Sequence, residues 1–191
     1  MSGVYDSIRQ LMLPMRQIDE SLPRTGTIVD LGCGQGAIAS ALAQVPTRHV
    51  IGMDADESRI DLANSKKTQS NLEFKYQDLT KLELDQIDGA LISDVLHHVV
   101  PVSSHRGILQ KVYDALPSGG VFVIKDVDSS EFVRTRLSML WDKLLYPKDR
   151  TFYHHYRDLI SMLEEIGFKV TMTREVRFFP GSTTLYVCRK P

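Results

Sequence analysis

Apolar positions along this chain follow two repeating patterns, and the two patterns alternate with one another. Short apolar runs rich in β-branched residues and bounded by turn residues predict strands. Between these runs, apolar residues recur at spacings of three and four, which predicts amphipathic helices with one buried face. The predicted strands are residues 27–30, 49–53, 72–76, 87–93 and 121–124, and the main predicted helices are residues 37–44, 104–116, 131–146 and 158–166.

Two further strands are predicted near the end of the sequence, at residues 168–176 and 183–188. The connection between them is too short for a crossover helix, so we expect an antiparallel pair. The preceding alternation of strand and helix predicts a doubly wound, mostly parallel α/β sheet with helices on both faces. An amphipathic segment at residues 4–21, interrupted by Pro14, precedes the first strand. We expect one domain over residues 1–191.

Composition narrows the class of protein without naming a function. The 191 residues are 42% hydrophobic and 25% charged with a net charge of −1, which is ordinary for a globular protein and gives no support for nucleic acid as the main partner. Cys33 and Cys188 form no metal-spaced pair, so we expect no metal site and a reducing compartment. No signal-peptide pattern and no membrane-spanning run are visible, which predicts a cytoplasmic protein whose oligomeric state is open.

Three glycines follow the first predicted strand at alternate positions, Gly32, Gly34 and Gly36. An ordinary turn between a strand and a helix usually needs one glycine. Glycines let the backbone adopt positive φ and let a ligand approach without meeting a Cβ atom. Asp30, at the end of the strand, can accept hydrogen bonds from a cationic or hydroxyl-bearing ligand. This turn is therefore the candidate ligand-binding element of the chain.

Acidic residues also end the next three predicted strands, at Asp54, Asp78 and Asp94. Open α/β sheets bind ligands at the carboxyl ends of their strands. A carboxylate at Asp54 suits the two hydroxyls of a ribose, and one at Asp78 suits an exocyclic adenine amine. The alternative for Asp54 is a helix cap, a role that Asp56 or Ser58 fits equally well.

Five segments occur in an order that resembles the motifs of class I, Rossmann-like S-adenosylmethionine-dependent methyltransferases. Val-Asp-Leu-Gly-Cys-Gly-Gln-Gly at 29–36 resembles the first motif of that family, and Gly-Met-Asp-Ala at 52–55 resembles its second-strand acid. The other matching segments are residues 77–79, 88–98 and 116–120. The resemblance implies a seven-stranded sheet of order 3-2-1-4-5-7-6 with strand seven antiparallel, which agrees with the predicted terminal pair.

The same resemblance implies the cofactor S-adenosyl-L-methionine, its product S-adenosyl-L-homocysteine, and the residues that bind them. Asp30 would face the methionine amino group and Asp54 the ribose hydroxyls. Ala55 is smaller than the residue often found after the second-strand acid, which leaves the adenine wall to Met53 or Leu79. The implied cofactor-binding set is Asp30, Gly32, Gly34, Gly36, Asp54, Ala55, Asp78, Leu79, Ser93 and Asp94, with the last two beneath the sulfonium.

Methyl transfer from a sulfonium can run largely on positioning, so a general base is needed only for an acceptor that arrives protonated. The candidates are His98, His154 and Asp126, because two histidine pairs, 97–98 and 154–155, are expected near the mouth of the site. The alternative for each histidine is a structural or solvated side chain.

Residues 1–22 and 129–156 are expected to form a small helical lid. Its apolar pocket would be lined by Phe132, Met139, Trp141, Phe152 and Tyr153; the alternative is that these residues belong to the core or to a dimer face. No Asn-Pro-Pro-Tyr-type segment, typical of nucleic-acid amino-methylating members, follows the fourth predicted strand. We therefore expect a small-molecule, lipid-like or carrier-bound acceptor.

Two other functions fit parts of the sequence. The spacing Gly32-x-Gly34-x-x-Ala37 with Asp54 beyond it also satisfies a dinucleotide-binding fingerprint, which would suit an NAD-dependent oxidoreductase. That function does not require Asp30, Asp78 or Asp94. A non-catalytic partner protein that retains the cofactor pocket is the other alternative. A methyltransferase accounts for more of these residues than either alternative does.

Overall fold

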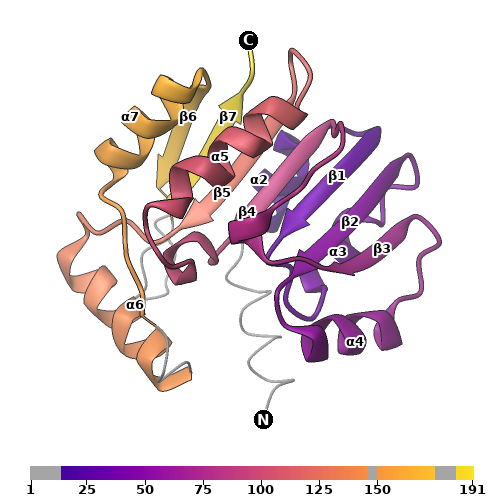
Figure 1. The fold of residues 1–191 in the computed structure, drawn as a ribbon, viewed down its shortest axis with the longest axis horizontal. Helices are drawn as coiled ribbons and strands as arrows, with labels where there is room; N and C mark the ends of the chain where they lie inside the picture. Colours follow the sequence, from indigo (N-terminus) through magenta and orange to yellow (C-terminus); the bar gives the residue numbers. More distant parts are fainter. Residues whose placement is uncertain (1–13, 146–149, 175–183) are drawn as a thin grey trace.

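The computed structural model describes residues 14–145, 150–174 and 184–191, and its centre is a seven-stranded sheet (Figure 1). The strands are β1 (Gly26–Leu31), β2 (Arg48–Asp54), β3 (Leu72–Tyr76), β4 (Gly89–Ser93), β5 (Val121–Asp126), β6 (Lys169–Arg174) and β7 (Thr184–Arg189). Their order across the sheet is β3-β2-β1-β4-β5-β7-β6, and β7 runs antiparallel to both of its neighbours. The predicted fold and strand order are confirmed.

The four helices predicted at residues 37–44, 104–116, 131–146 and 158–166 are present close to those ranges, together with others. The helices are α2 (Met15–Ser21), α3 (Ala37–Leu42), α4 (Glu57–Lys66), α5 (Ser104–Ala115), α6 (Phe132–Leu145) and α7 (Tyr156–Ile166), with short 3₁₀ turns η1 (Leu79–Lys81) and η2 (Leu96–His98). In the segment predicted to be helical at 4–21, the described helix begins directly after Pro14, where a proline is well tolerated. Residues 1–13, and with them most of that prediction, lie outside the described part.

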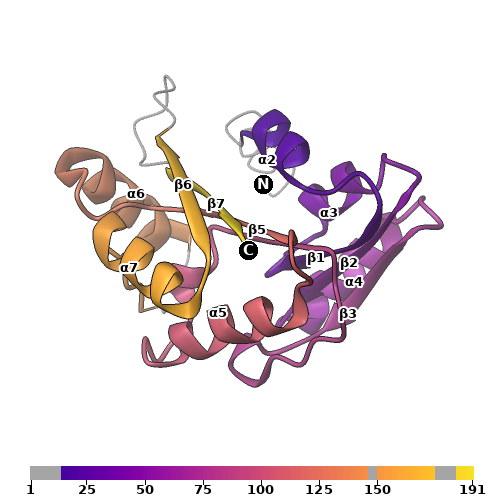
Figure 2. The ribbon, with the colours of Figure 1, turned by 90° about the horizontal axis from the view of Figure 1, so that it is seen from above.

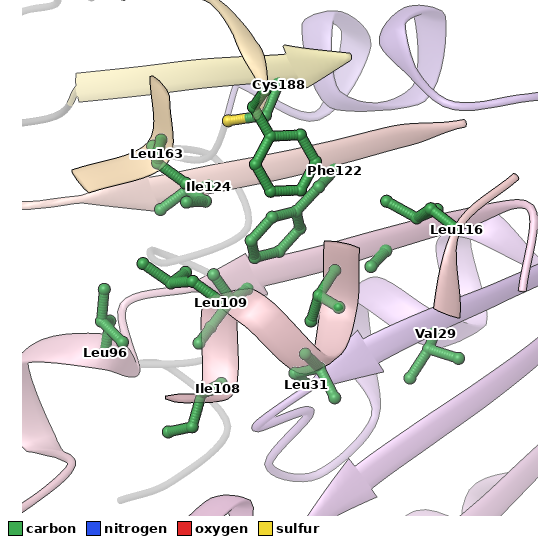
Figure 3. Close-up of a cluster of buried hydrophobic side chains, with 14 of the residues drawn as sticks. Val29, Leu31, Leu96, Ile108, Leu109, Leu116, Phe122, Ile124, Leu163 and Cys188 are labelled. Atoms are coloured by element: carbon green, nitrogen blue, oxygen red, sulfur yellow. The ribbon is translucent and has the colours of Figure 1, made fainter. Parts of the chain in front are cut away.

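The alternation of side chains along each strand divides the core into two clusters, one on each face of the sheet. Val29 and Leu31 point to the face covered by α5 and α7, where Leu109 and Leu163 are fully buried (Figure 3). Ile28, adjacent to Val29 in sequence, belongs to the opposite cluster with residues from α2, α3 and α4. Figure 2 shows α2 and α3 on one side of the sheet and α5 on the other. This three-layer arrangement leaves the carboxyl ends of the strands accessible for a site.

A fully buried arginine ties the segment before β1 to the start of β2. The guanidinium of Arg48 donates to the Asp19 carboxylate at 2.5 Å and to the carbonyl oxygens of Asp19 and Pro23 at 3.0 and 2.7 Å. Asp19 also accepts from the exposed Arg24 at 2.6 Å. Because Arg48 makes several bonds at once, it fixes the course of the chain from α2 into β1.

Candidate cofactor and acceptor site

Each of the strands β1 to β5 places an aspartate at its carboxyl end or within two residues of it. These residues are Asp30, Asp54, Asp78, Asp94 and Asp126. Because the five strands are parallel, the five carboxyl groups lie along one edge of the sheet. Lys125 contributes a cation at the same edge. The excess of negative charge favours a ligand that carries positive charge.

The three glycines of the turn between β1 and α3 differ in what surrounds them. Gly32, Gly34 and Gly36 all have positive φ, at 77°, 55° and 80°. A Cβ atom at Gly32 would lie 2.3 Å from Val95, and one at Gly36 would lie 2.3 Å from Phe74, whereas a Cβ at Gly34 would meet nothing within 4 Å. Gly32 and Gly36 are therefore required by packing inside the protein. Gly34 is the position of the turn with an open side.

Asp54 holds this turn in place through its carboxylate. Its Oδ2 accepts from the backbone N–H of Gly34 at 2.8 Å, and its Oδ1 accepts from the N–H of Asp56 at 3.0 Å. Asp56, and not Asp54, caps α4 by accepting from Ser58 and Arg59, so the cap interpretation of Asp54 is wrong. Each carboxylate oxygen has a second lone pair, which leaves capacity for ligand hydroxyls. Ala55, the next residue, is exposed.

The other residues that the sequence predicts to bind the cofactor occupy different environments. Asp30 is buried at 1% exposure near the end of β1. Asp78 caps η1 by accepting from the backbone N–H and the hydroxyl of Thr80, at 2.9 and 2.8 Å, and these bonds hold the pKa of Asp78 below its usual value. Leu79 belongs to the hydrophobic core. Asp78 is therefore a charged carboxylate at neutral pH with one oxygen already engaged.

Ser93 and Asp94 stand where β4 ends, and Asp94 has an unusual backbone. Its φ of 55° is in the left-handed region, which few non-glycine residues adopt and which costs energy; such residues cluster at functional sites. The ammonium of Lys125 lies 2.5 Å from both carboxylate oxygens of Asp94, and Ser93 is buried. Sequence reasoning missed Lys125; the available signal was a lysine at the end of an otherwise apolar strand.

The structure brings Asp126 together with His97. The Nδ1 atom of His97 forms a short hydrogen bond with Oδ1 of Asp126, and this oxygen also accepts from the N–H of Val127 at 2.8 Å. The ring of Tyr153 stacks on the His97 ring at 5.1 Å, and the ring of His98 lies 4.2 Å from it. The carboxylate of Asp126 therefore orients the imidazole of His97, not that of the predicted His98.

His154 pairs with a histidine that the sequence did not single out. Its Nε2 lies 2.7 Å from Nδ1 of His105, and Nε2 of His105 donates to the carbonyl oxygen of Val99 at 2.8 Å. Since a carbonyl only accepts, the Nε2 atom of His105 carries a proton; with His105 neutral, its Nδ1 atom accepts a hydrogen bond from the Nε2–H of His154. Burial and the adjacent His105 lower the pKa of His154, so it is neutral at physiological pH. His105 was missed because it lies within a predicted amphipathic helix.

The residues expected to line a lid pocket differ in how far they are exposed to solvent. Phe132 is 66% exposed and Met139 is 46% exposed, so neither belongs to the core, which was one of the two alternatives; the other, a dimer face, stays a prediction. Phe152 is 44% exposed, while Tyr153 is half-buried over His97. The side chain of Trp141 lies outside the described residues. A lid over the site stays a prediction.

A sheet of order 3-2-1-4-5-7-6 with β7 reversed, a glycine turn after β1 and an acid at each of the first five strand ends together define a class I S-adenosylmethionine-dependent methyltransferase. Comparison with known proteins leads to the same class. The chain belongs to the methyltransferase-domain family, which it matches over residues 4–173. S-adenosylmethionine is therefore its cofactor.

Individual relatives differ in what they act on. The chain is 26% identical over 162 residues to the carboxy-S-adenosyl-L-methionine synthase of Helicobacter hepaticus, a match covering 74% of this chain and 67% of that protein. It is 31% identical to the trans-aconitate 2-methyltransferase of Variovorax paradoxus, over 61% of this chain but only 44% of that protein. A methyltransferase structure from Mesorhizobium loti superposes with a TM-score of 0.74 at 21% identity, covering 92% of this chain and 96% of that one.

Within the described ranges, no helix combines the length and the apolar character that crossing a membrane requires. In the same ranges, no group of three or more histidine, cysteine or acidic side chains is arranged to hold a metal ion.

Proposed function

We propose that this protein transfers the methyl group of S-adenosylmethionine to a small-molecule, lipid-like or carrier-bound acceptor. The observation that carries the proposal is the row of five aspartates along the strand ends beside the open side of Gly34. S-adenosylmethionine carries a sulfonium and an ammonium group, so an acidic edge favours it over the anionic dinucleotides. The kinship to a trans-aconitate methyltransferase supports a small-molecule acceptor.

For the residues that bind the methyl donor, the proposed roles are those that the family resemblance implies. Asp30 binds the amino group of the methionine part, and Asp54 binds the ribose hydroxyls. Asp78, Leu79 and Ala55 contact the adenine. The backbone of Gly32, Gly34 and Gly36 borders the methionine and ribose parts, and Ser93 and Asp94 lie toward the sulfonium. The bound cofactor supplies an electrophilic methyl group, so the protein chiefly has to align a nucleophile with it.

On the acceptor side, the pairing of Asp126 with His97 adds a candidate base to His98 and His154. A carboxylate bonded to Nδ1 fixes the tautomer of an imidazole and stabilises the imidazolium that forms when the ring takes a proton. In this role Asp126 positions His97. Because Tyr153 covers the His97 ring, access of an acceptor to this imidazole depends on the segment 150–155. The neutral His154 is a second group able to take a proton.

Binding measurements distinguish this function from its alternatives. We expect calorimetry to show binding of S-adenosylmethionine and S-adenosylhomocysteine and none of NADH. We expect radiolabelled methyl transfer in a panel of small carboxylates, phenols, amines and amphiphilic acceptors. Binding of NADH alone would contradict the proposal, and tight cofactor binding with no product across the panel would favour a non-catalytic partner protein.

A further inference from the structure

Exposed apolar side chains are concentrated on one helix. Ten large apolar side chains are exposed in the described part of the chain, and six of them lie on α6. Figures 1 and 2 both show α6 at the periphery of the molecule. Soluble proteins rarely expose contiguous apolar surface without a binding purpose. This helix therefore calls for an explanation that the cofactor site does not provide.

The exposed side chains form two parallel stripes along α6. Val133, Leu137, Leu140 and Leu144 follow one another at spacings of four, three and four, so they line one stripe. The adjacent stripe has the same spacing and consists of Phe132, Arg136, Met139 and Lys143, all exposed. Apolar and cationic residues thus alternate within the second stripe.

The opposite side of the helix faces the protein. Thr135 is buried, and its hydroxyl donates to the carbonyl oxygen of Asp128 at 2.7 Å. Arg134 pairs with Glu131 at 3.7 Å. Thr135 is thus a point at which α6 contacts the rest of the protein, while both stripes are exposed to solvent.

The charges on the exposed face have one sign. Among the side chains of this face that the structure describes, Arg136 and Lys143 are the charged ones. The guanidinium of Arg136 stands 4.4 Å from the centre of the Phe132 ring, so its stem and the ring form one continuous surface. An apolar stripe bordered by cations complements a surface that is apolar inside and anionic at its boundary.

We propose that α6 docks this protein on an anionic lipid surface. The stripe of Val133, Leu137, Leu140 and Leu144 enters the boundary of the acyl chains, and Arg136 and Lys143 meet the phosphate groups. The 14 residues of α6 lie along the surface and do not cross it. This docking goes beyond methyl transfer and does not depend on it.

A second copy of the chain fits the same face less well. A twofold interface brings identical surfaces together, so Arg136 and Lys143 of two copies would be buried against each other with no acid from either stripe to compensate them. An anionic lipid surface provides that compensation. The charge pattern therefore favours lipid over self-association.

Vesicle flotation of the full chain tests the proposal. We expect flotation with vesicles of phosphatidylcholine containing 30 mol% phosphatidylserine, and about tenfold weaker association with pure phosphatidylcholine, since each cation near an anionic surface adds measurable attraction. Leu140→Glu should abolish flotation, and Arg136→Glu with Lys143→Glu should lower it to the level of pure phosphatidylcholine. Raising the salt to 0.5 M should weaken the binding of the wild type to anionic vesicles.

Leu62→Glu is the matched control, because Leu62 is 38% exposed on α4, a different helix, and its variant should float like the wild type. Thermal unfolding and sedimentation velocity of every variant, without cofactor, establish that each is folded and monomeric. Wild type that stays unbound, Leu140→Glu that floats normally, or a dimer that Leu140→Glu dissociates would overturn the proposal. Loss of cofactor binding in calorimetry would instead overturn the proposed function and leave the flotation result standing.

Discussion

Asp54 joins the turn that would face the cofactor to the start of α4, which makes it the most informative single residue on the donor side. Asp54→Ala should weaken S-adenosylmethionine binding by about 1–3 kcal/mol, the range for lost hydrogen bonds to a charged group. Asp54→Asn, which keeps an acceptor oxygen, should weaken it less. Isothermal calorimetry provides the measurement.

Asp56→Ala is the control for this experiment. It removes the cap of α4 and should lower the free energy of unfolding by about 1 kcal/mol while leaving affinity for the cofactor unchanged. Unchanged affinity in Asp54→Ala would remove the ribose role from Asp54.

Substitution of the proposed bases should separate chemistry from cofactor binding. For an acceptor that arrives protonated, His97→Ala should lower turnover by about 10²–10⁴-fold, the usual contribution of a general base, with cofactor affinity nearly unchanged. Asp126→Asn should act in the same direction through the orientation of His97. His98→Ala and His154→Ala, assayed in parallel, show which imidazole matters. Normal turnover in all four would mean that the reaction runs on proximity alone.

His154 gives the protein a pH dependence whose sign follows from its environment. Its pKa in the folded protein lies below the ordinary value of about 6.5, so the unfolded chain binds the proton more readily. The contribution of neutral His154 to the free energy of unfolding should therefore be fully present above about pH 6.5. It should be lost as the pH falls below that value. Urea unfolding at pH 7.5 and 5.5 should show a smaller difference for His154→Gln than for the wild type. An equal difference would show that His154 does not cause the acid sensitivity.

At the scale of elements, the surroundings of Gly34 and Gly36 predict different losses of stability when each is replaced by alanine. Gly34→Ala should cost about 1–2 kcal/mol of stability through its positive φ and reduce cofactor affinity, because its side is open. Gly36→Ala should cost more stability, since the added carbon also clashes with the ring of Phe74. Thermal unfolding and calorimetry on both variants provide the comparison. Greater loss of stability in Gly34→Ala would contradict this division.

The elements were predictable from sequence because each depends on a local pattern. The alternating pattern of the strands and the spacings of three and four in the helices located these elements within a few residues. The short connection between residues 176 and 183 predicted the reversed strand. What the pattern does not specify is the partner of an exposed or polar side chain. The stripes of α6 have the spacing of a buried helix, yet nothing in the chain covers them in the described part.

The side-chain pairs of the site were harder to predict from the sequence for the same reason. His97 meets Asp126, and Asp94 meets Lys125, across 29 and 31 residues of sequence. Each pair forms because β4 and β5 are neighbours whose ends are aligned, with Ser93 opposite Lys125. Sequence reasoning placed Asp94 at a strand end and the 97–98 histidine pair near the mouth of the site, but it did not single out Lys125. Which of two adjacent histidines turns toward the carboxylate depends on the course of η2, which no local pattern encodes.

At the scale of the whole molecule, Arg48 connects the N-terminal helix to the sheet. Arg48→Met removes bonds to Asp19, Pro23 and Leu22 from a buried position and should lower the free energy of unfolding by about 2–3 kcal/mol. Arg24→Met removes a bond to the same carboxylate from an exposed position and should cost about 0.5 kcal/mol or less. Urea denaturation of both variants measures the difference. Equal decreases in the free energy of unfolding would show that the burial of Arg48 does not strengthen its contribution to stability.

The reversed strand has a consequence for how the protein is made. β6 is synthesised before β7, yet β7 lies between β5 and β6 and pairs with both along six residues each. While the ribosome is still translating residues 175–183, β5 has an uncovered edge and β6 has no neighbour to pair with. The sheet is completed by insertion of a strand, not by addition to its rim. A nascent chain paused at that point displays an open strand edge, the surface to which chaperones and other extended segments bind.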